Sequence, residues 1–330
     1  PDAIENPQSQ IANSQSQIEN PKSQIFLSVP LSQVEQVVIF GNVGLTTPAM
    51  NAFLTQNTEV VFLSQRGEYR GRLIGQATPH VPVRRAQYRA IEKPAFALEM
   101  AKHFVRAKIQ HQKAFLLRNT RQERPAAVDE AVTRLQAALE ELEHKTTLES
   151  TRGLEGASTA AYFGGLRAFF TQEWGFDGRN RRPPRDPVNV LLSFGYTLLT
   201  QSVTAAVETA GLDPYAGFLH EYVYNRPALA LDLMEEFRPV IDGLVLWACR
   251  SGLLTPGGDF FPGDAERPVI LDEDGTRRFL QAYEQRMAQV SLHPVRQERL
   301  TLRQCLIEQA RQVARAVMEE QPVFIPMGYR

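Results

Sequence analysis

The sequence predicts an α+β protein, with a small N-terminal β-sheet domain followed by a larger all-α domain. Short runs of β-branched and aromatic residues fill residues 25–92, and a helical period of about 3.6 residues replaces them from Lys93 onward. At 330 residues and 43% hydrophobic content, the chain is long and apolar enough for two folded units. We therefore expect three parts, comprising residues 1–24, 25–92 and 93–330.

Residues 1–24 are rich in Gln, Ser and Asn and contain an imperfect repeat, SQIAN followed by SQIEN. Such a segment holds too little apolar surface to bury, so it is typical of a flexible tail or linker. The chain opens at Pro1, which suggests that it is a piece of a longer protein.

The β domain is predicted from short strand-like runs that are separated by turn residues such as Gly41-Asn42 and Arg66-Gly67. A short helix is expected between strands at Thr47–Leu54. The predicted strands are Ile25–Val29, Val34–Phe40, Val60–Leu63 and Tyr69–Ile74.

The all-α domain begins with a long helix from Lys93 to Leu117, whose apolar residues recur at helical spacing. Pro239 removes a helical N–H, so we expect a bend shortly after Glu235. Residues 171–185 and 255–268 are rich in Gly and Pro and are predicted loops. The further predicted helices are Ala126–Lys145, Leu148–Phe170, Pro187–Ala210, Pro227–Arg250, Asp272–Met287 and Arg296–Glu320.

Charge is unevenly distributed along a chain whose net charge is −1. Residues 1–124 carry 15 Lys and Arg against 9 Asp and Glu, so this part is basic and the remainder is acidic. A basic part of this kind suits a DNA backbone, or it is simply a solvated surface. Cys249 and Cys305 fit neither a zinc motif nor a disulfide framework. No signal peptide and no long apolar span is predicted, which favours a cytoplasmic protein without a membrane partner.

Glu155, His220 and Glu235 are the candidate catalytic and metal-binding residues. Two carboxylates and one imidazole, without a thiolate, suit Mg²⁺ or Mn²⁺ and the phosphodiester chemistry that these ions support. Asp232 lies one helical turn before Glu235 on the same face and is a further possible ligand. Each residue also has a plainer interpretation: a surface glutamate, a helix-capping histidine and a solvated acidic face.

Basic and aromatic residues provide a candidate DNA surface, since arginines bind phosphates and aromatic rings stack on bases. Tyr162, Trp174 and Tyr222 are possible stacking groups, with core packing as the alternative, and Arg238 either binds DNA or pairs with the acidic cluster. The basic candidates are Arg84, Arg85 and Arg89; Arg106, Lys108, Lys113, Arg118, Arg121 and Arg124; and Arg179, Arg181, Arg182 and Arg185.

Several phrases of the chain carry a family resemblance. The segments 154–163, 217–222 and 229–239 surround the three candidate ligands, and Gln33–Asn42, Val60–Leu73 and Asp186–Tyr196 occur in the same order and with similar spacing. Together they resemble the CRISPR adaptation integrase, the metal-dependent nuclease that inserts new spacers into CRISPR arrays. The similarity runs from about residue 25 to the C-terminus.

The resemblance implies that Glu155, His220 and Glu235 chelate the catalytic divalent metal and that Asp232 lies close to it. It also implies a homodimer formed through the β domain, a small second adaptation protein as partner, and double-stranded and branched DNA as substrates. The nucleophile would be water in hydrolysis and a DNA 3′-hydroxyl in integration. Some relatives are fused to a reverse transcriptase, and residues 1–24 would suit such a linker.

This chain departs from the family at its N-terminus, where the polar repeat replaces the usual opening strand or hairpin, so dimer assembly is the implication most affected. Two other functions remain open from the residues. One is a non-catalytic DNA-binding assembly subunit, which would bind DNA without metal. The other is an unrelated helical metal hydrolase acting on a small phosphoester, which would not bind DNA even at low salt.

Overall fold

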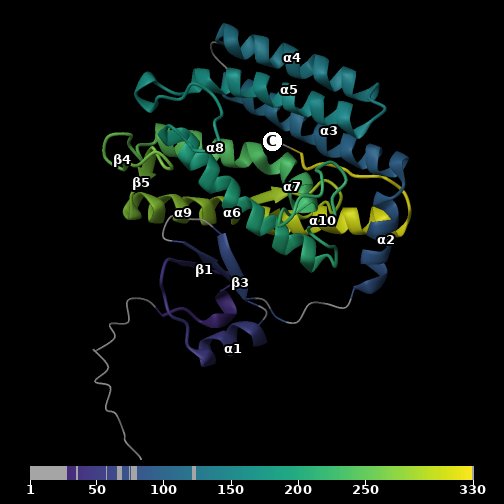
Figure 1. The fold of residues 1–330 in the computed structure, drawn as a ribbon, viewed down its shortest axis with the longest axis horizontal. Helices are drawn as coiled ribbons and strands as arrows, with labels where there is room; N and C mark the ends of the chain where they lie inside the picture. Colours follow the sequence, from purple (N-terminus) through teal and green to yellow (C-terminus); the bar gives the residue numbers. More distant parts are fainter. Residues whose placement is uncertain are drawn as a thin grey trace, which may run out of the picture.

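The computed structural model describes residues 28–34, 36–56, 58–64, 69–73, 75, 80–120 and 124–328. The predicted tail at residues 1–24 lies outside this part, as does most of the predicted strand Ile25–Val29. Ser28 and Val29, which are described, belong to no strand. The predicted order of a small β-sheet followed by a mostly helical region is confirmed (Figure 1).

The N-terminal sheet has the strand order β1-β2-β3, with β1 at Gln36–Phe40, β2 at Glu59–Leu63 and β3 at Tyr69–Leu73. β1 and β2 run parallel and are connected through helix α1 (Thr47–Thr55), whereas β2 and β3 run antiparallel. A short 3₁₀ turn, η1 (Leu31–Gln33), precedes β1. The β2 residues Val61 and Leu63 share one face and belong to the main core, whereas Val60 is buried on the opposite face.

The sheet is fastened to the helical region by polar contacts. Arg72 on β3 forms an ion pair with Glu59 of its own sheet at 3.2 Å and a second with Glu208 of helix α6. Arg303 of helix α10 donates to Gln36 of β1 at 3.3 Å. These contacts orient the small sheet against α6 and α10 (Figure 1).

The helical region is built on two groups of helices (Figure 1). Helices α3 (Pro94–Arg118), α4 (Ala126–Glu143) and α5 (Leu148–Leu166) lie side by side in one layer. Helices α6 (Pro187–Thr209), α8 (Arg238–Arg250), α9 (Glu273–Met287) and α10 (Leu302–Met318) form the second group. A continuous core of buried apolar side chains joins the two groups, with Phe104 and Tyr162 among its largest members.

Helix α6 corrects one expectation. Pro187–Thr209 is long and apolar enough to cross a membrane by length and composition, although no long apolar span was predicted. In this structure 61% of its apolar window is buried inside the molecule. The composition of α6 therefore matches that of a core helix packed against α7, α8 and α10.

The predicted helix Pro227–Arg250 is interrupted where a bend was expected. It consists of α7 (Ala228–Met234), the 3₁₀ turn η4 (Glu235–Phe237) and α8, which begins at Arg238. Pro239 occupies the first turn of α8, where its missing N–H is tolerated. The turn η4 points Glu235 and Glu236 into the interior, and both are buried.

Three local predictions are wrong. Residues 81–91 form a helix, α2 (Val81–Ile91), which packs against α3 and α10 instead of joining the β-sheet. The predicted loop 255–268 contains β4 (Phe260–Pro262), which pairs with β5 (Val269–Leu271). The last predicted helix begins later, because β6 (Val290–Leu292) pairs with β7 (Arg299–Thr301) and Thr301 then caps α10. Strands of three residues are too short to produce a period in the sequence.

Candidate functional site

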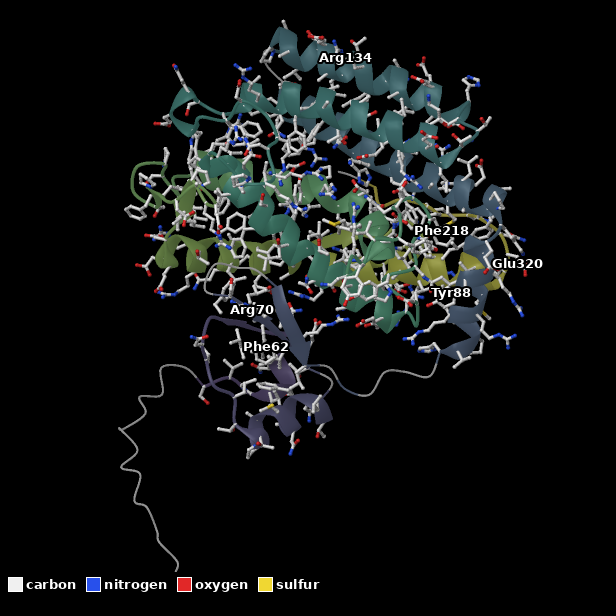
Figure 2. All side chains as sticks on the ribbon, in the orientation of Figure 1. Phe62, Arg70, Tyr88, Arg134, Phe218 and Glu320 are labelled. Atoms are coloured by element: carbon white, nitrogen blue, oxygen red, sulfur yellow. The ribbon has the colours of Figure 1, made fainter. Side chains whose placement is uncertain are left out.

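The three candidate ligands come from three separate elements that meet beside α3. Glu155 lies on α5, His220 lies in the loop between α6 and α7, and Glu235 opens η4. The Glu235 side chain is 2% exposed, whereas those of His220 and Glu155 are 19% and 23% exposed. Figure 2 labels Phe218, which lies in this loop two residues before His220 and, in this view, on the same side of the molecule as Tyr88. The site is therefore partly open at His220 and Glu155 and closed at Glu235.

Lys108 of α3 joins the two candidate carboxylates. Its ammonium nitrogen contacts a carboxylate oxygen of Glu155 and lies 2.6 Å from Oε2 of Glu235. The Lys108 side chain is 2% exposed, so the ammonium is withdrawn from solvent. Its inclusion among the basic residues that bind DNA was therefore wrong.

Asp232 holds the loop that carries His220 through four hydrogen bonds, two of which come from His220 itself. Its Oδ2 accepts from the backbone N–H groups of Phe218 at 2.6 Å and Leu219 at 2.9 Å. Its Oδ1 accepts from the backbone N–H of His220 at 3.0 Å and from the ring Nδ1 at 2.7 Å. A ring that donates through Nδ1 presents Nε2 as an acceptor, and this atom lies 3.9 Å from Oε1 of Glu235. Both Asp232 oxygens are thus used in holding the loop and the imidazole.

Glu235 is held as a carboxylate by the cations around it. Burial by itself would raise its pKa, but Arg238 and Lys108 together keep the pKa well below its usual range. Arg238 donates from Nε to Oε2 of Glu235 at 2.8 Å. The predicted pairing of Arg238 with the acidic cluster is therefore present.

The residues fit a hard divalent cation. Two carboxylates from separate elements already share one cation, the Lys108 ammonium, and the Nε2 atom of His220 lies 3.9 Å from Oε1 of Glu235. Oxygen donors with one imidazole are typical ligands of Mg²⁺ and Mn²⁺. Among the described residues, no group of three or more His, Cys, Asp or Glu side chains is gathered to hold a metal as it stands, and the lysine occupies the space between the carboxylates.

A buried polar network extends from Arg238 into the core. The Arg238 guanidinium lies 4.7 Å from the ring centre of Tyr196, whose hydroxyl donates to Asp242. The hydroxyl of Tyr162 donates to the other Asp242 oxygen at 2.7 Å, and burial raises the pKa of Asp242 to about 6. Tyr162 is fully buried, so its predicted stacking on DNA is wrong and core packing, the alternative interpretation, is correct. Trp174 is buried as well, whereas Tyr222 is exposed.

The predicted DNA-binding arginines fall into two groups. Arg179 lies within the fold, where it donates to Asn189 at 2.7 Å and to Ser193 at 3.0 Å, so its side chain organises the loop before α6. Burial lowers the pKa of Arg179 to about 10. Arg84 is half-buried. The exposed members are Arg85, Arg89, Arg124, Arg181, Arg182 and Arg185, and Arg121 lies outside the described residues.

These exposed arginines do not form one continuous patch. Arg85 and Arg89 lie on α2, whereas Arg181 and Arg182 lie in the loop between α5 and α6, at the opposite end of the helical region (Figure 1). The sequence predicted a single DNA surface for both groups and gave no sign that they are separated.

Sequence reasoning missed the role of Lys108 and the opposite orientation of Glu236. Glu236 accepts from Gln309 at 2.7 Å and from the Met327 backbone N–H at 3.0 Å, on the side of η4 that faces α10. The only available signal was a lysine flanked by apolar residues at helical spacing on α3, which indicates a buried position.

The chain was compared with protein-family models, curated proteins and solved structures. The family described as CRISPR associated protein Cas1 matches residues 4–285. CRISPR-associated endonuclease Cas1 3 of Thermus thermophilus is 37% identical over 306 residues, which cover 93% of this chain and 89% of the relative.

Two solved structures share the fold. A Cas1 protein from Thermotoga maritima superposes with a TM-score of 0.74 at 22% identity and covers 91% of both chains. A chain of a Cas6-RT-Cas1–Cas2 complex superposes with a TM-score of 0.77 at 25% identity, over 92% of this chain and 33% of that one. The extent of these matches confirms the predicted family and fold class: this chain belongs to the Cas1 family, the endonuclease-integrases of CRISPR adaptation.

Proposed function

We propose that this Cas1 protein cuts and joins DNA at a single divalent metal centre held by Glu155, His220 and Glu235. The observation that carries the proposal is the shared cation position. The carboxylates of Glu155 and Glu235 already hold one ammonium between them, and Nε2 of His220 faces Glu235 from 3.9 Å. Mg²⁺ and Mn²⁺ are the proposed ions, because both prefer oxygen donors.

The surrounding residues have distinct roles in this proposal. Asp232 fixes the ring of His220 and its tautomer, so that Nε2 remains available; we therefore assign it to positioning and not to the ligand set. Arg238 neutralises Glu235 from the buried side. When bound, the metal would polarise the scissile phosphate and stabilise the negative charge that develops as water or a DNA 3′-hydroxyl attacks.

Phosphate contacts outside the metal centre are assigned to the exposed arginines. Exposed side chains can contact a DNA backbone without any rearrangement of the fold, and we assign this role to Arg85 and Arg89 on α2 and to Arg181 and Arg182 before α6. Tyr222, which is 64% exposed two residues after His220, is placed to stack against a base near the metal centre.

Partners are proposed on the same basis. One solved relative of this fold is part of a complex named for Cas6, a reverse transcriptase, Cas1 and Cas2. We propose that this chain forms a homodimer through residues 25–92 and works with a small second adaptation protein, with a reverse transcriptase fused or associated, in the cytoplasm.

Cleavage of a branched DNA duplex tests the metal centre directly. The wild-type protein is assayed with Mg²⁺, with Mn²⁺ and with EDTA, beside Glu155→Ala, His220→Ala and Glu235→Ala. Glu149→Ala removes a carboxylate from the exposed first turn of α5 and is the matched control. We expect metal-dependent cutting that is lost in the three site variants and kept in the control.

Three outcomes would contradict the proposal. Tight DNA binding by the wild type, without cutting in either metal, would favour the non-catalytic assembly subunit. Cutting that persists in all three site variants would place the metal elsewhere. DNA binding absent even at low salt would favour a small-phosphoester hydrolase, because phosphate contacts are strongest there.

A further inference from the structure

Lys108 is a buried cation at the centre of the candidate site. It lies in the middle of α3, between the Glu155-bearing helix α5 and the turn η4 that carries Glu235. Its ammonium contacts both carboxylates, and its side chain is 2% exposed. A buried ammonium is costly unless its charge is compensated. The two contacts therefore account for the burial, and they also tie three elements together.

The charges at the site are already balanced without a metal. Glu155 and Glu235 carry two negative charges, while Lys108 and Arg238 carry two positive charges, and Lys108 and Arg238 both contact Oε2 of Glu235. Asp232 is compensated separately by three backbone N–H groups and the His220 ring. A divalent cation entering this site must therefore compete with cations that the chain itself supplies.

We infer that Lys108 is a positioning residue that acts as the resident counter-ion of the site. In the metal-free protein its ammonium holds Glu155 against Glu235, and it gives up these carboxylate oxygens when a divalent cation binds. The inference rests on the proposed metal centre. Two consequences follow: the three elements stay assembled without metal, and the metal affinity of the wild type is lower than its ligands alone would provide.

Lys108 differs from the other basic residues of α3 in its burial and in its partners. Arg106 pairs with Glu143 at the surface, and Lys113 donates to Gln136 at an exposed position. Lys102 is the other buried lysine of α3, and it pairs with Glu99 and lies 3.3 Å from the carbonyl oxygen of Glu143, away from the site residues. Lys102 is therefore the matched control for a buried ammonium on this helix.

The test measures Mn²⁺ binding and thermal stability instead of cleavage. Lys108→Met keeps the length of the side chain and removes its charge, and Lys102→Met is the control. The Mn²⁺ dissociation constant is measured from the electron paramagnetic resonance signal of free Mn²⁺, and the Tm is measured in EDTA and in saturating Mn²⁺.

We expect Lys108→Met to bind Mn²⁺ at least about tenfold more tightly, because one nearby like charge has been removed from a partly buried site. Its Tm in EDTA falls below that of the wild type, and Mn²⁺ raises the Tm by more than in the wild type. Lys102→Met keeps the wild-type dissociation constant.

A second variant covers the case in which Lys108→Met does not fold in EDTA. Lys108→Arg keeps the positive charge, so its Mn²⁺ affinity should stay within about threefold of the wild type. Recovery of folded Lys108→Met by Mn²⁺, with Lys108→Arg folded in EDTA, supports the inference.

An unchanged or weaker Mn²⁺ affinity in folded Lys108→Met would overturn the counter-ion role while leaving the metal centre in place. A Lys108→Arg affinity that rises as much as that of Lys108→Met would also overturn it. If the wild type binds no Mn²⁺, the proposed metal centre fails, and the inference fails with it.

Discussion

Two adjacent glutamates on the same 3₁₀ turn face opposite sides and have opposite chemistry. Glu235 and Glu236 are 2% and 3% exposed, so they pay a similar desolvation cost. Glu235 faces Arg238 and Lys108, whose positive charges keep its pKa well below the usual range. Among the described residues, the Glu236 carboxyl accepts from neutral groups, the Gln309 amide and the Met327 backbone N–H, and burial raises its pKa to about 8. Partners, and not burial, decide which glutamate is a carboxylate at neutral pH.

The surroundings of Glu235 and Glu236 also differ. On the Glu235 side, three elements converge on a cation position that opens toward His220 and Glu155. On the Glu236 side, a cavity of about 180 Å³ is lined by His111, Phe237 and Met327. The ring nitrogens of His111 lie 2.7 Å from the Glu236 carbonyl and 2.6 Å from the Met327 carbonyl, which fastens the C-terminal segment to α3. The Glu235 side carries the proposed metal ligands, and the Glu236 side secures the fold.

The same isosteric change at the two positions should give the largest contrast. Glu235→Gln removes a proposed metal ligand, and we expect DNA cleavage to fall by more than about 100-fold, beyond the 10–100-fold typical of outer-shell changes. Glu236→Gln should retain cleavage within about fivefold, because that carboxyl is already largely protonated near neutral pH. Single-turnover cleavage of branched DNA, with both proteins checked for folding, measures the contrast. Equal losses at the two positions would remove the distinction.

The next largest effect is expected at Asp232, which accepts a hydrogen bond from the ring of His220. Asp232→Asn keeps the shape of the side chain but loses one acceptor for the four N–H groups around it. We expect Mn²⁺ affinity to fall by about 10–100-fold, because an imidazole without its orienting partner binds a metal less well. A calorimetric titration with Mn²⁺ measures this change. A complete loss of binding, equal to that of His220→Ala, would instead make Asp232 a ligand.

The raised pKa of Glu236 predicts a pH dependence of stability of known sign. Between about pH 6.5 and 8 the folded protein holds a proton on Glu236 that the unfolded chain has released, since the ordinary pKa is 4.5. The free energy of unfolding should therefore decrease as pH rises, by up to about 2 kcal/mol across this window. Urea unfolding in EDTA at several pH values measures the slope, and Glu236→Gln should lack this part of it. An identical slope in both proteins would refute the assignment.

The smallest expected effects come from comparing a core residue, Tyr162, with a proposed DNA contact, Arg181. Tyr162→Phe removes one buried hydroxyl that donates to Asp242, so the free energy of unfolding should fall by about 1 kcal/mol while DNA affinity stays unchanged. Arg181→Ala should show the reverse. Its free energy of unfolding should be unchanged, and the slope of log binding constant against log salt concentration should decrease by about one unit, as expected for one lost phosphate contact. A loss of DNA affinity in Tyr162→Phe, measured by fluorescence anisotropy, would restore Tyr162 to the DNA surface.

The sequence by itself determined the family, the β-then-α order and most of the helices. Long periodic stretches such as α3 and α6 are encoded by local spacing, and the Pro239 break after α7 follows from a missing N–H. The phrases around Glu155, His220 and Glu235 were sufficient to predict these three as candidate ligands, because neighbouring residues in the chain carried the resemblance.

Only the tertiary structure decided which side chains meet. Lys108 precedes Glu155 by 47 positions in the chain, and the apolar residues around it indicate burial but do not identify its partners. The burial of Tyr162 depends on the contact of α5 with α8, and the opposite orientations of Glu235 and Glu236 depend on the contacts of η4 with α3 and α10. The saturation of Asp232 depends on the loop that precedes α7. Contacts between residues far apart in sequence determine burial and charge pairing, and these set the chemistry of a carboxylate, which residue type alone does not.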